Sequence, residues 1–493
     1  MTSRESVLRL LTIGARVAEE EAHELEEYFL ETDQFHRIIA GEVDIVFGPK
    51  GSGKSAIYSS VLAKAAEMFD SSIFLVAGEN PKGSTAFAGI KDDPPSSEDE
   101  FKAVWKLYVL SLISDVMTEY ALSSSEAKQV RSVLAEMGLT KGGGGLSALL
   151  HNVVEYLSAV LRPQSLEGAI IFEPLSGIPT GLVGKITLRE PSDLERAAGF
   201  VSIDQLLVIA DSALEAANIE VWILFDRLDV AFEGSALIEA RALRSLFRVY
   251  LDLLGFEHIQ LKIFIRSDIW KTLTLEGFRE ASHITRTATI TWTDVSLLNL
   301  IVRRLVKNDE LLEFLNMEAE VALRDAHSQR DFLDRILPDR IPEKRSRPKT
   351  YDWILSRTKD GTGSTAPREL IHYLTESRNI QLAMIERGEH DQSETFLLSR
   401  QAIRSALAEV SQVRLEQTIY AEYPLLRHPI SLLEHKKSSQ TTASLSEIWE
   451  VSHVESSNLA ARLLDIGFFE SEGERSDPVF VVPHLYRPAL EMT

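Results

Sequence analysis

Short apolar runs and longer amphipathic stretches alternate along the first 300 residues of the sequence. Five runs have the length and the content of β-branched and aromatic residues that buried strands show, at residues 43–47, 72–77, 219–225, 261–265 and 288–292. Helical patterns lie between these runs, and one of them follows the first run directly, at residues 56–69. This alternation predicts an α/β fold, in which a parallel sheet is covered by helices on both faces.

The rest of the chain reads as mostly helical. An acidic amphipathic pattern spans residues 19–30, and a long helical stretch at residues 100–161 is interrupted by Gly142 to Gly145. These glycines lie beside Lys141, as in some phosphate sites, but no strand precedes them, so a flexible turn is favoured. Another helical region runs from Asp294 to Glu386.

The last 50 residues predict helix, turn, helix and two short strands, which is the order of a winged helix. We therefore expect three domains. They are a P-loop core at residues 1–292 with a helical insertion at about 92–165, a helical lid at 293–395 and a winged-helix-like domain at 396–493.

The segment between the first apolar run and its helix has the spacing of a P-loop. In such a loop, glycines let backbone amides surround phosphate oxygens, a lysine reaches the β- and γ-phosphates, and a hydroxyl ligates Mg²⁺. The start of the following helix adds its positive dipole end. The sequence thus predicts binding of ATP and Mg²⁺ by Gly48, Pro49, Lys50, Gly51, Ser52, Gly53, Lys54, Ser55 and Ala56.

A carboxylate at the end of a buried strand is the second part of such a site. Asp226 ends the apolar run 219–225 and is the expected partner of Mg²⁺, together with Ser55. Arg227 follows it, where many P-loop ATPases place a catalytic glutamate. Asp229 is the nearest alternative that could orient the attacking water, although pairing with Arg227 or capping a helix explains it equally well.

Three arginines are candidates for sensing or completing the nucleotide site. Arg266 ends the fourth run and is placed to contact the γ-phosphate, or else to pair with Asp268. Arg286, just before the fifth run, is a candidate for reaching a neighbouring subunit's ATP. Arg368, in the sequence Pro-Arg-Glu-Leu, opens a lid helix from which it can reach back to the nucleotide. For Arg286 and Arg368, a role without contact to a nucleotide is the alternative.

The composition limits the classes of partner. The formal net charge is −22, which opposes general affinity for nucleic acid, and the absence of cysteine excludes disulfides and thiolate metal sites. The sequence shows neither a secretory signal nor an apolar stretch of about 18 residues, so we expect a soluble, cytoplasmic protein without membrane contact.

Taken together, these motifs resemble those of the AAA-like and STAND-like ATPases, and in particular a bacterial P-loop ATPase family. The shared segments span nearly the whole chain: Phe47 to Ser55, the acidic helix at 18–30, Glu79 to Gly83, the Asp-Arg-Leu-Asp motif at 226–229, Arg266 to Trp270 and the Pro-Arg-Glu-Leu lid motif. The resemblance implies an ATP-hydrolysing switch that forms homo-oligomers and controls a separate protein effector, often in antiviral defence.

Two further functions remain open. One is a DNA-binding ATPase of the initiator or loader type; the other is a scaffold that binds ATP structurally and turns it over little. The expected recognition helix at about 455–464 carries Asn458 and Arg462, but residues 401–493 hold eight Lys and Arg against thirteen Asp and Glu, and the expected wing at 470–474 is acidic. The sequence therefore favours protein contacts, or packing on the ATPase core, over DNA binding for this domain.

Overall fold

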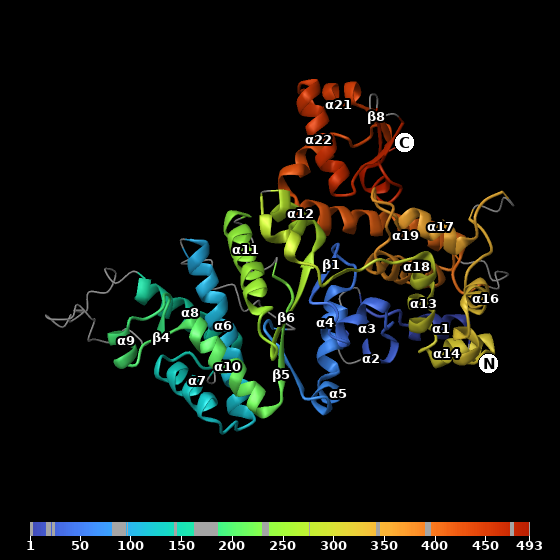
Figure 1. Cartoon of the computed structure of the whole chain (residues 1–493). Coiled ribbons are helices and arrows are strands. Elements are labelled where there is room, and N and C mark those ends of the chain that lie inside the picture. Colours follow the sequence, from blue (N-terminus) through green and yellow to red (C-terminus); the bar gives the residue numbers. More distant parts are fainter. Residues whose placement is uncertain are drawn as a thin grey trace. The chain divides into compact units, whose positions relative to one another are not determined.

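A computed structural model gives the fold of the chain (Figure 1). It describes residues 3–15, 21, 25–80, 95, 97–141, 145–161, 186–228, 236–275, 277–341, 346–389, 396–473 and 478–492. The chain divides into two compact units. The sheet unit comprises Glu31–Pro49 and Lys54–Ile290, and the helical unit comprises Met1–Leu30, Lys50–Gly53 and Thr291–Thr493.

The sheet unit is built on a five-stranded parallel sheet, as the sequence predicts. Its strands, in the order in which they pair, are β2 (Ile73–Ala77), β5 (Glu220–Phe225), β6 (Ile259–Arg266), β1 (Ile45–Gly48) and β7 (Thr287–Thr289). All five predicted apolar runs form strands, with ends shifted by up to three residues. The register pairs Gly48 of β1 with Arg266 of β6. Arg266, the residue predicted to contact the γ-phosphate, therefore lies beside the end of the strand that leads into the P-loop.

Helices cover both faces of this sheet (Figure 1). One side carries α3 (Asp33–Ile39), α4 (Lys54–Ala63) and α5 (Ala65–Asp70), and the other carries α10 (Ile203–Ala217) and α11 (Ala236–Leu253). The short helices α12 (Ser267–Leu275) and η5 (Arg279–His283) connect β6 to β7. The predicted α/β class is therefore confirmed.

The helical insertion predicted at about 92–165 contains three helices, and a small sheet follows it in the chain. The helices are α6 (Glu98–Glu119), α7 (Ser125–Glu136) and α8 (Gly145–Leu161), and α9 (Asp193–Ala197) lies between the paired strands β3 (Ile186–Thr187) and β4 (Val201–Ser202). Helix α6 is apolar on nearly all sides because α7, α8, α10 and α11 all pack against it. Of the four glycines near Lys141, Gly142 to Gly144 lie outside the described residues, and Gly145 begins α8.

The helical unit contains the predicted lid. Its first helix, α1 (Arg4–Leu10), comes from the N-terminus, and Val7 and Leu8 are buried in the core of this unit. The side chain of Asn308 accepts the N–H of Thr12 at 2.7 Å and donates to its carbonyl at 2.9 Å. The remaining helices are α2 (Leu25–Tyr28), α13 (Asp294–Leu305), α14 (Asp309–Leu315), α15 (Ala319–Leu323), α16 (Ala326–Ile336), α17 (Thr350–Thr358), α18 (Pro367–Glu386) and α19 (Arg400–Arg414).

The division into units ends the sheet unit at Ile290, close to the boundary predicted at residue 292, and places residues 1–30 with the helical unit. The sequence predicts residues 19–30 as one helix. The structure describes them only in part, and the helical part that it describes is α2. The boundary expected between lid and winged helix at residues 395 and 396 stays a prediction.

The C-terminal domain has the predicted winged-helix order. After a π-helical turn (η6, Leu415–Tyr420), a 3₁₀ turn (η7, Pro424–Leu426) and α20 (Arg427–Ser431), strand β8 (Ser439–Thr441) leads into α21 (Thr442–Trp449) and α22 (His453–Asp465). Strands β9 (Glu470–Glu472) and β10 (Val479–Val481) follow, and the antiparallel sheet has the order β8-β10-β9. Strand β8 is an element that the sequence analysis missed. The chain closes with the turn η8 (Pro488–Leu490).

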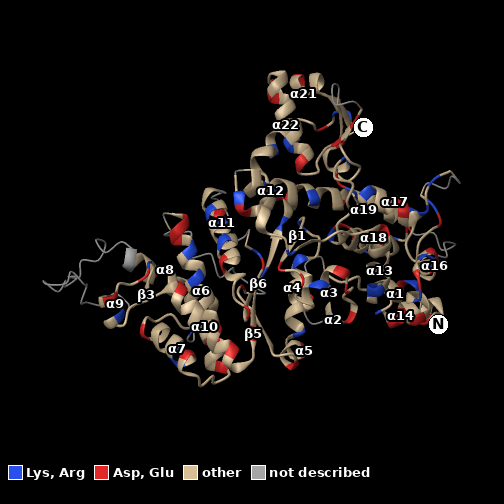
Figure 2. Ribbon diagram, viewed as in Figure 1, with Lys and Arg blue, Asp and Glu red and all other residues tan. Residues whose placement is uncertain are grey.

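Charged side chains of both signs are interspersed along the helices of both units (Figure 2). In the described part of the chain, no helix combines the length and the apolar character that a membrane crossing requires.

Candidate nucleotide site

The backbone of residues 48–55 has the form that phosphate binding requires. Strand β1 ends at Gly48, and helix α4 begins at Lys54, two residues before the predicted start at residue 56. Gly51 and Gly53 adopt φ values of +81° and +96°, a region that is costly for any residue with a Cβ atom. These two glycines therefore let the loop turn tightly, as a turn that presents backbone amides to an anion needs to do.

The polar side chains of the loop fit a bound polyphosphate. The Lys54 ammonium donates to the carbonyl oxygens of Gly48 at 2.8 Å and Pro49 at 3.1 Å, so it lies folded over the loop. Ser55 and Ala56 occupy the first turn of α4. The Ser52 hydroxyl is buried and has no hydrogen-bond partner among the described residues. A buried hydroxyl in a loop of this shape suits a ligand rich in oxygen atoms.

Asp226 follows directly on β5 and is buried, with 3% of its surface exposed. Burial raises the pKa of Tyr58, on α4, and the carboxylates of Asp226 and Glu79 add to this effect. The charge of Asp226 therefore acts on a side chain of α4, the helix that follows the P-loop. The next residue, Arg227, has φ of +57°, so the chain turns sharply just after the carboxylate.

The donors expected for Mg²⁺ are the Ser55 hydroxyl and the Asp226 carboxylate. Groups of three or more His, Asp or Glu side chains that could hold a metal are absent from the described residues. At nucleotide sites, one or two protein oxygens, water and the substrate phosphates share the coordination of Mg²⁺.

Glu79 is a buried carboxylate near the end of β2 that the sequence analysis did not consider as a site residue. It follows β2 by one residue, is completely buried, and its backbone carbonyl accepts the hydroxyl of Tyr58 at 2.9 Å. Its carboxylate accepts the N–H of Asn80 at 2.9 Å. The signal was available, because a polar residue after a buried parallel strand lies at the carboxyl edge of the sheet, where ligands bind.

Arg266 ends β6 and makes the ion pair that its alternative interpretation predicts. Its Nε and Nη2 atoms donate to the two carboxylate oxygens of Asp268 at 3.1 and 2.6 Å, and only 8% of its side chain is exposed. Contact with a γ-phosphate stays a prediction. Asp229, the candidate for orienting water, lies outside the described residues.

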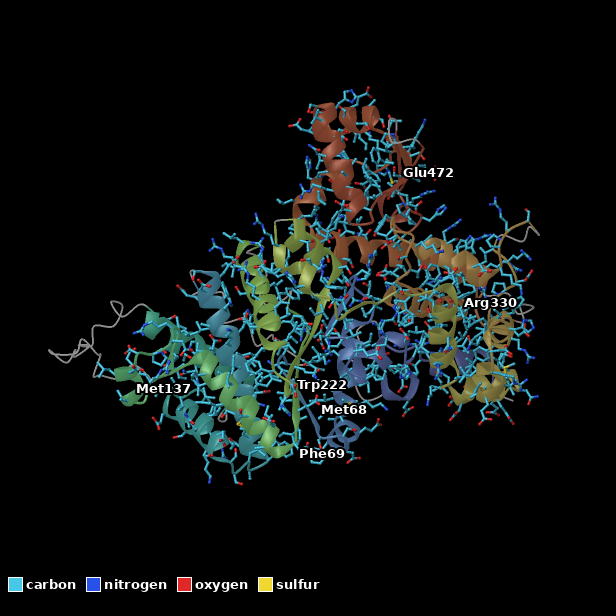
Figure 3. The ribbon with its side chains drawn as sticks, viewed as in Figure 1. Met68, Phe69, Met137, Trp222, Arg330 and Glu472 are labelled. Atoms are coloured by element: carbon cyan, nitrogen blue, oxygen red, sulfur yellow. The ribbon has the colours of Figure 1, made fainter. Side chains whose placement is uncertain are left out.

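Arg286 is held at the amino end of β1, whereas the P-loop leaves from the carboxyl end. Its Nε atom lies 2.8 Å from the Asp44 carboxylate, which also accepts Lys262 Nζ at 2.7 Å and the Tyr250 hydroxyl at 3.0 Å. The Lys262 ammonium is buried 4.1 Å from the ring centre of Trp222, which Figure 3 labels, and burial lowers its pKa. Action of Arg286 on a neighbouring subunit stays a prediction.

Arg368 lies in the first turn of α18, where the sequence predicts a lid helix. Within the helical unit, a Cβ atom added to Gly51 would lie 3.2 Å from Arg368 Cβ and 3.6 Å from Ala366 Cβ. The Arg368 Nε atom is buried without a hydrogen-bond partner among the described residues. The start of this helix thus lies against Gly51, and contact of Arg368 with a nucleotide stays a prediction.

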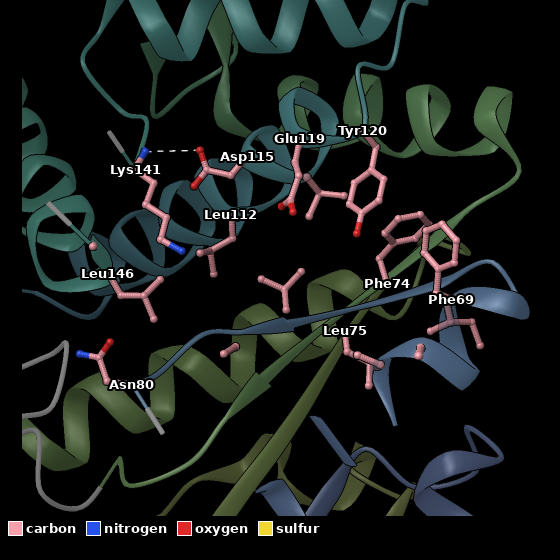
Figure 4. A pocket seen from close by; sticks show the side chains of 17 residues that line it. Phe69, Phe74, Leu75, Asn80, Leu112, Asp115, Glu119, Tyr120, Lys141 and Leu146 are labelled. Atoms are coloured by element: carbon pink, nitrogen blue, oxygen red, sulfur yellow. Dashed lines mark hydrogen bonds between the residues drawn. The ribbon is translucent and has the colours of Figure 1, made fainter. Parts of the chain in front are cut away.

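A separate cavity of about 730 Å³ runs along β2, the outer strand of the sheet (Figure 4). All five residues of β2 line it, together with Leu112, Asp115 and Lys141, whose N–H donates to the Asp115 carboxylate at 3.3 Å. Burial raises the pKa of Asp115. Every residue predicted for the nucleotide site lies outside its lining.

The surface of the winged-helix domain is mixed in charge. Helix α22, the predicted recognition helix, exposes Val454, Ser457, Asn458 and Arg462. The wing strand β9 exposes Glu472, labelled in Figure 3. Carboxylates are exposed on both elements, since α22 also exposes Glu455 and Asp465, and Arg462 is the one exposed arginine of the helix.

No protein-family model matches the chain, and a search of curated proteins gives no match. Among solved structures, the chain is similar to the ORC1 protein of Aeropyrum pernix in complex with DNA, at 12% identity and a TM-score of 0.33, over 100% of this chain and 97% of that one. It is also similar to the Aeropyrum pernix ORC2 protein in ADPNP-ADP complexes (13% identity, TM-score 0.40, 97% and 94% covered). A third similarity is to Cdc6p from Pyrobaculum aerophilum, at 12% identity and a TM-score of 0.30, over 99% of this chain and 97% of that one. At these values the likeness carries no argument about activity, which has to come from the residues of this chain.

Proposed function

We propose that this chain binds ATP with Mg²⁺ at residues 48–56 and hydrolyses it. The observation that carries the proposal is the conformation of the loop, with Gly51 and Gly53 at positive φ between the end of β1 and the start of α4 at Lys54. A glycine-rich turn between a buried parallel strand and a helix, with a lysine and a serine opening that helix, suits a triphosphate.

The side chains divide the work between binding and reaction. Lys54 would leave the Gly48 and Pro49 carbonyls and pair with the β- and γ-phosphates. Ser55 and Asp226 would hold Mg²⁺, which when bound neutralises charge on the phosphate oxygens. Glu79, buried at the same edge of the sheet, is a candidate beside Asp229 for orienting the attacking water.

Phosphate release by the full chain tests this proposal. We expect Mg²⁺-dependent release for the wild type, and for Asp226→Asn we expect retained ATP binding with hydrolysis reduced at least tenfold. Asp115→Asn is the matched control, because this carboxylate lines the cavity along β2 and should leave the rate unchanged. Equal rates for wild type and Asp226→Asn would remove Asp226 from the site.

We further propose that hydrolysis acts as a switch, with Arg368 of the lid responding to the nucleotide. The packing of α18 on Gly51 supports this step. Homo-oligomers and control of a separate effector in antiphage defence are implied by the sequence resemblance alone, and the comparisons give them no support. A scaffold role would require that Lys54→Ala preserve both assembly and biological activity.

DNA binding, as in initiator or loader ATPases, is a second candidate function. The winged-helix order supports it, together with the exposed Asn458 and Arg462 on α22. Fluorescence anisotropy with duplex DNA at several salt concentrations tests it. Arg462→Ala should weaken salt-sensitive binding, whereas Arg404→Ala, an exposed arginine on α19, should not. Lack of binding at low salt would reject this candidate.

A further inference from the structure

The tip of the P-loop is held by a tryptophan from the start of the helical region. Trp292 immediately precedes Thr293, the N-cap of α13, and its indole N–H donates to the carbonyl oxygen of Ser52 at 2.8 Å. The same ring also lies close to Gly53, because a Cβ atom added to Gly53 would lie 3.9 Å from the Cζ2 atom of Trp292. Ser52, Gly53 and Trp292 all belong to the helical unit.

This hydrogen bond sets the direction of the amide between Ser52 and Gly53, which belongs to the loop proposed to bind phosphate. A trans peptide is planar, so the carbonyl of Ser52 and the N–H of Gly53 point in opposite directions. If Trp292 holds the carbonyl, the N–H of Gly53 is turned away from the indole. Gly53 has no side chain to limit its rotation, so an external hydrogen bond is an effective way to restrict this peptide.

A second contact holds the same loop two residues earlier. The Lys50 ammonium pairs with the Glu422 carboxylate and donates to the carbonyl of Gln417 at 3.3 Å. Gln417 lies in the π-helical turn at Leu415–Tyr420, a rare conformation that is frequent at functional sites. Both charged side chains are largely buried, with 29% and 20% exposed.

We propose that Trp292 is a positioning residue for the phosphate site, and that the Lys50–Glu422 pair is a second anchor of the same loop. Nucleotide affinity is then set in part by residues that follow the sheet unit in sequence. This inference rests on the proposed binding of ATP at the P-loop. It is independent of which carboxylate activates water.

Replacing the tryptophan by phenylalanine removes the N–H and keeps an aromatic ring. For Trp292→Phe we expect a fluorescent ADP analogue to bind roughly three- to tenfold more weakly, which is the effect of one lost hydrogen bond. The KM for ATP should rise by the same factor with kcat unchanged at saturation, because the group acts on binding. Trp353→Phe is the matched control, since Trp353 lies on α17 of the same unit and should leave affinity unchanged.

Thermal unfolding without nucleotide separates positioning from general stability. Trp292→Phe should unfold within about 2 °C of the Trp353→Phe control, while its stabilisation by added ADP is smaller than that of the wild type. A large loss of stability without nucleotide, or a fall in kcat at saturating ATP, would overturn the positioning role. Adding Glu422→Gln to Trp292→Phe should weaken binding further, and unchanged affinity would reject the second anchor.

Lys54→Ala distinguishes failure of this inference from failure of the proposed function. If Lys54→Ala loses nucleotide binding and Trp292→Phe keeps wild-type affinity, the positioning role is wrong and nucleotide binding at the P-loop stands. If Lys54→Ala keeps wild-type affinity, nucleotide binding at the P-loop is itself wrong.

Discussion

Arg286→Ala is the perturbation that best separates a structural role from a role in another subunit. In the structure, the Arg286 guanidinium pairs with Asp44 at the amino end of β1, where Asp44 is 4% exposed. After the substitution, Asp44 keeps Lys262 at 2.7 Å and Tyr250 at 3.0 Å, so its charge remains compensated. The loss should therefore be moderate.

The size of the loss follows from the exposure of the pair. A hydrogen bond to a charged group contributes about 1.5–3 kcal/mol, but 43% of the Arg286 side chain is exposed, and exposed pairs contribute about 0–1 kcal/mol. We expect a reduction of about 1–2 kcal/mol in the free energy of unfolding. For the sheet unit of 256 residues this corresponds to a fall in Tm of roughly 2–4 °C.

Two measurements on the same preparation test this reasoning. Thermal unfolding at low protein concentration should show the fall in Tm, and the ATPase rate of the folded variant should match the wild type. An unchanged Tm, with hydrolysis lost only at concentrations where the protein assembles, would refute the structural role. That result would instead support the action of Arg286 on a neighbouring subunit.

Three further predictions concern other parts of the fold. Gly78→Ala should destabilise the protein by about 1–3 kcal/mol in urea unfolding, because a Cβ atom there would lie 2.5 Å from a buried aromatic ring, whereas Gly255→Ala, with its nearest atom at 4.0 Å, should not. Arg414→Met should cost about 3–5 kcal/mol in the same assay by leaving the buried Glu369 carboxylate without its partner at 2.8 Å. Burial lowers the pKa of His484 to about 4, and two nearby arginines add to the effect. In the unfolded chain this histidine takes up a proton below about pH 6.5, whereas in the folded chain it does so only near pH 4. Stability should thus fall as the pH drops through that window, and His484→Gln should flatten the dependence.

The central sheet was predictable because its strands are short, apolar and separated by helical patterns. Phe47 and Phe225 each precede a polar segment that reads clearly as the end of a strand. The paired order of the strands was harder to predict. The contact predicted between Arg266 and the γ-phosphate does require its strand to lie near the P-loop strand, and β6 pairs with β1. Strand β8 was missed because Ser439–Thr441 is three residues long and polar, and only its pairing with β10 makes it a strand.

Contacts between distant segments account for the rest. Neither the Trp292–Ser52 hydrogen bond nor the Lys50–Glu422 pair can be deduced from local patterns, since they join residues 240 and 372 positions apart. The partner of Arg286 was likewise hidden, because Asp44 reads as a polar interruption of an apolar run. Burial of Glu79 could not be predicted either, because it depends on the packing of Tyr58 and Tyr108, which are distant in sequence, around the end of β2.

Equilibrium binding of ATP in the presence of Mg²⁺ tests the central claim most directly, with the wild-type chain measured beside Lys54→Ala by calorimetry. The account predicts saturable binding with one site per chain for the wild type and a loss of at least tenfold in affinity for the variant. Equal affinity in the two proteins, or no binding to the wild type, would contradict the assignment of residues 48–56 as a nucleotide site.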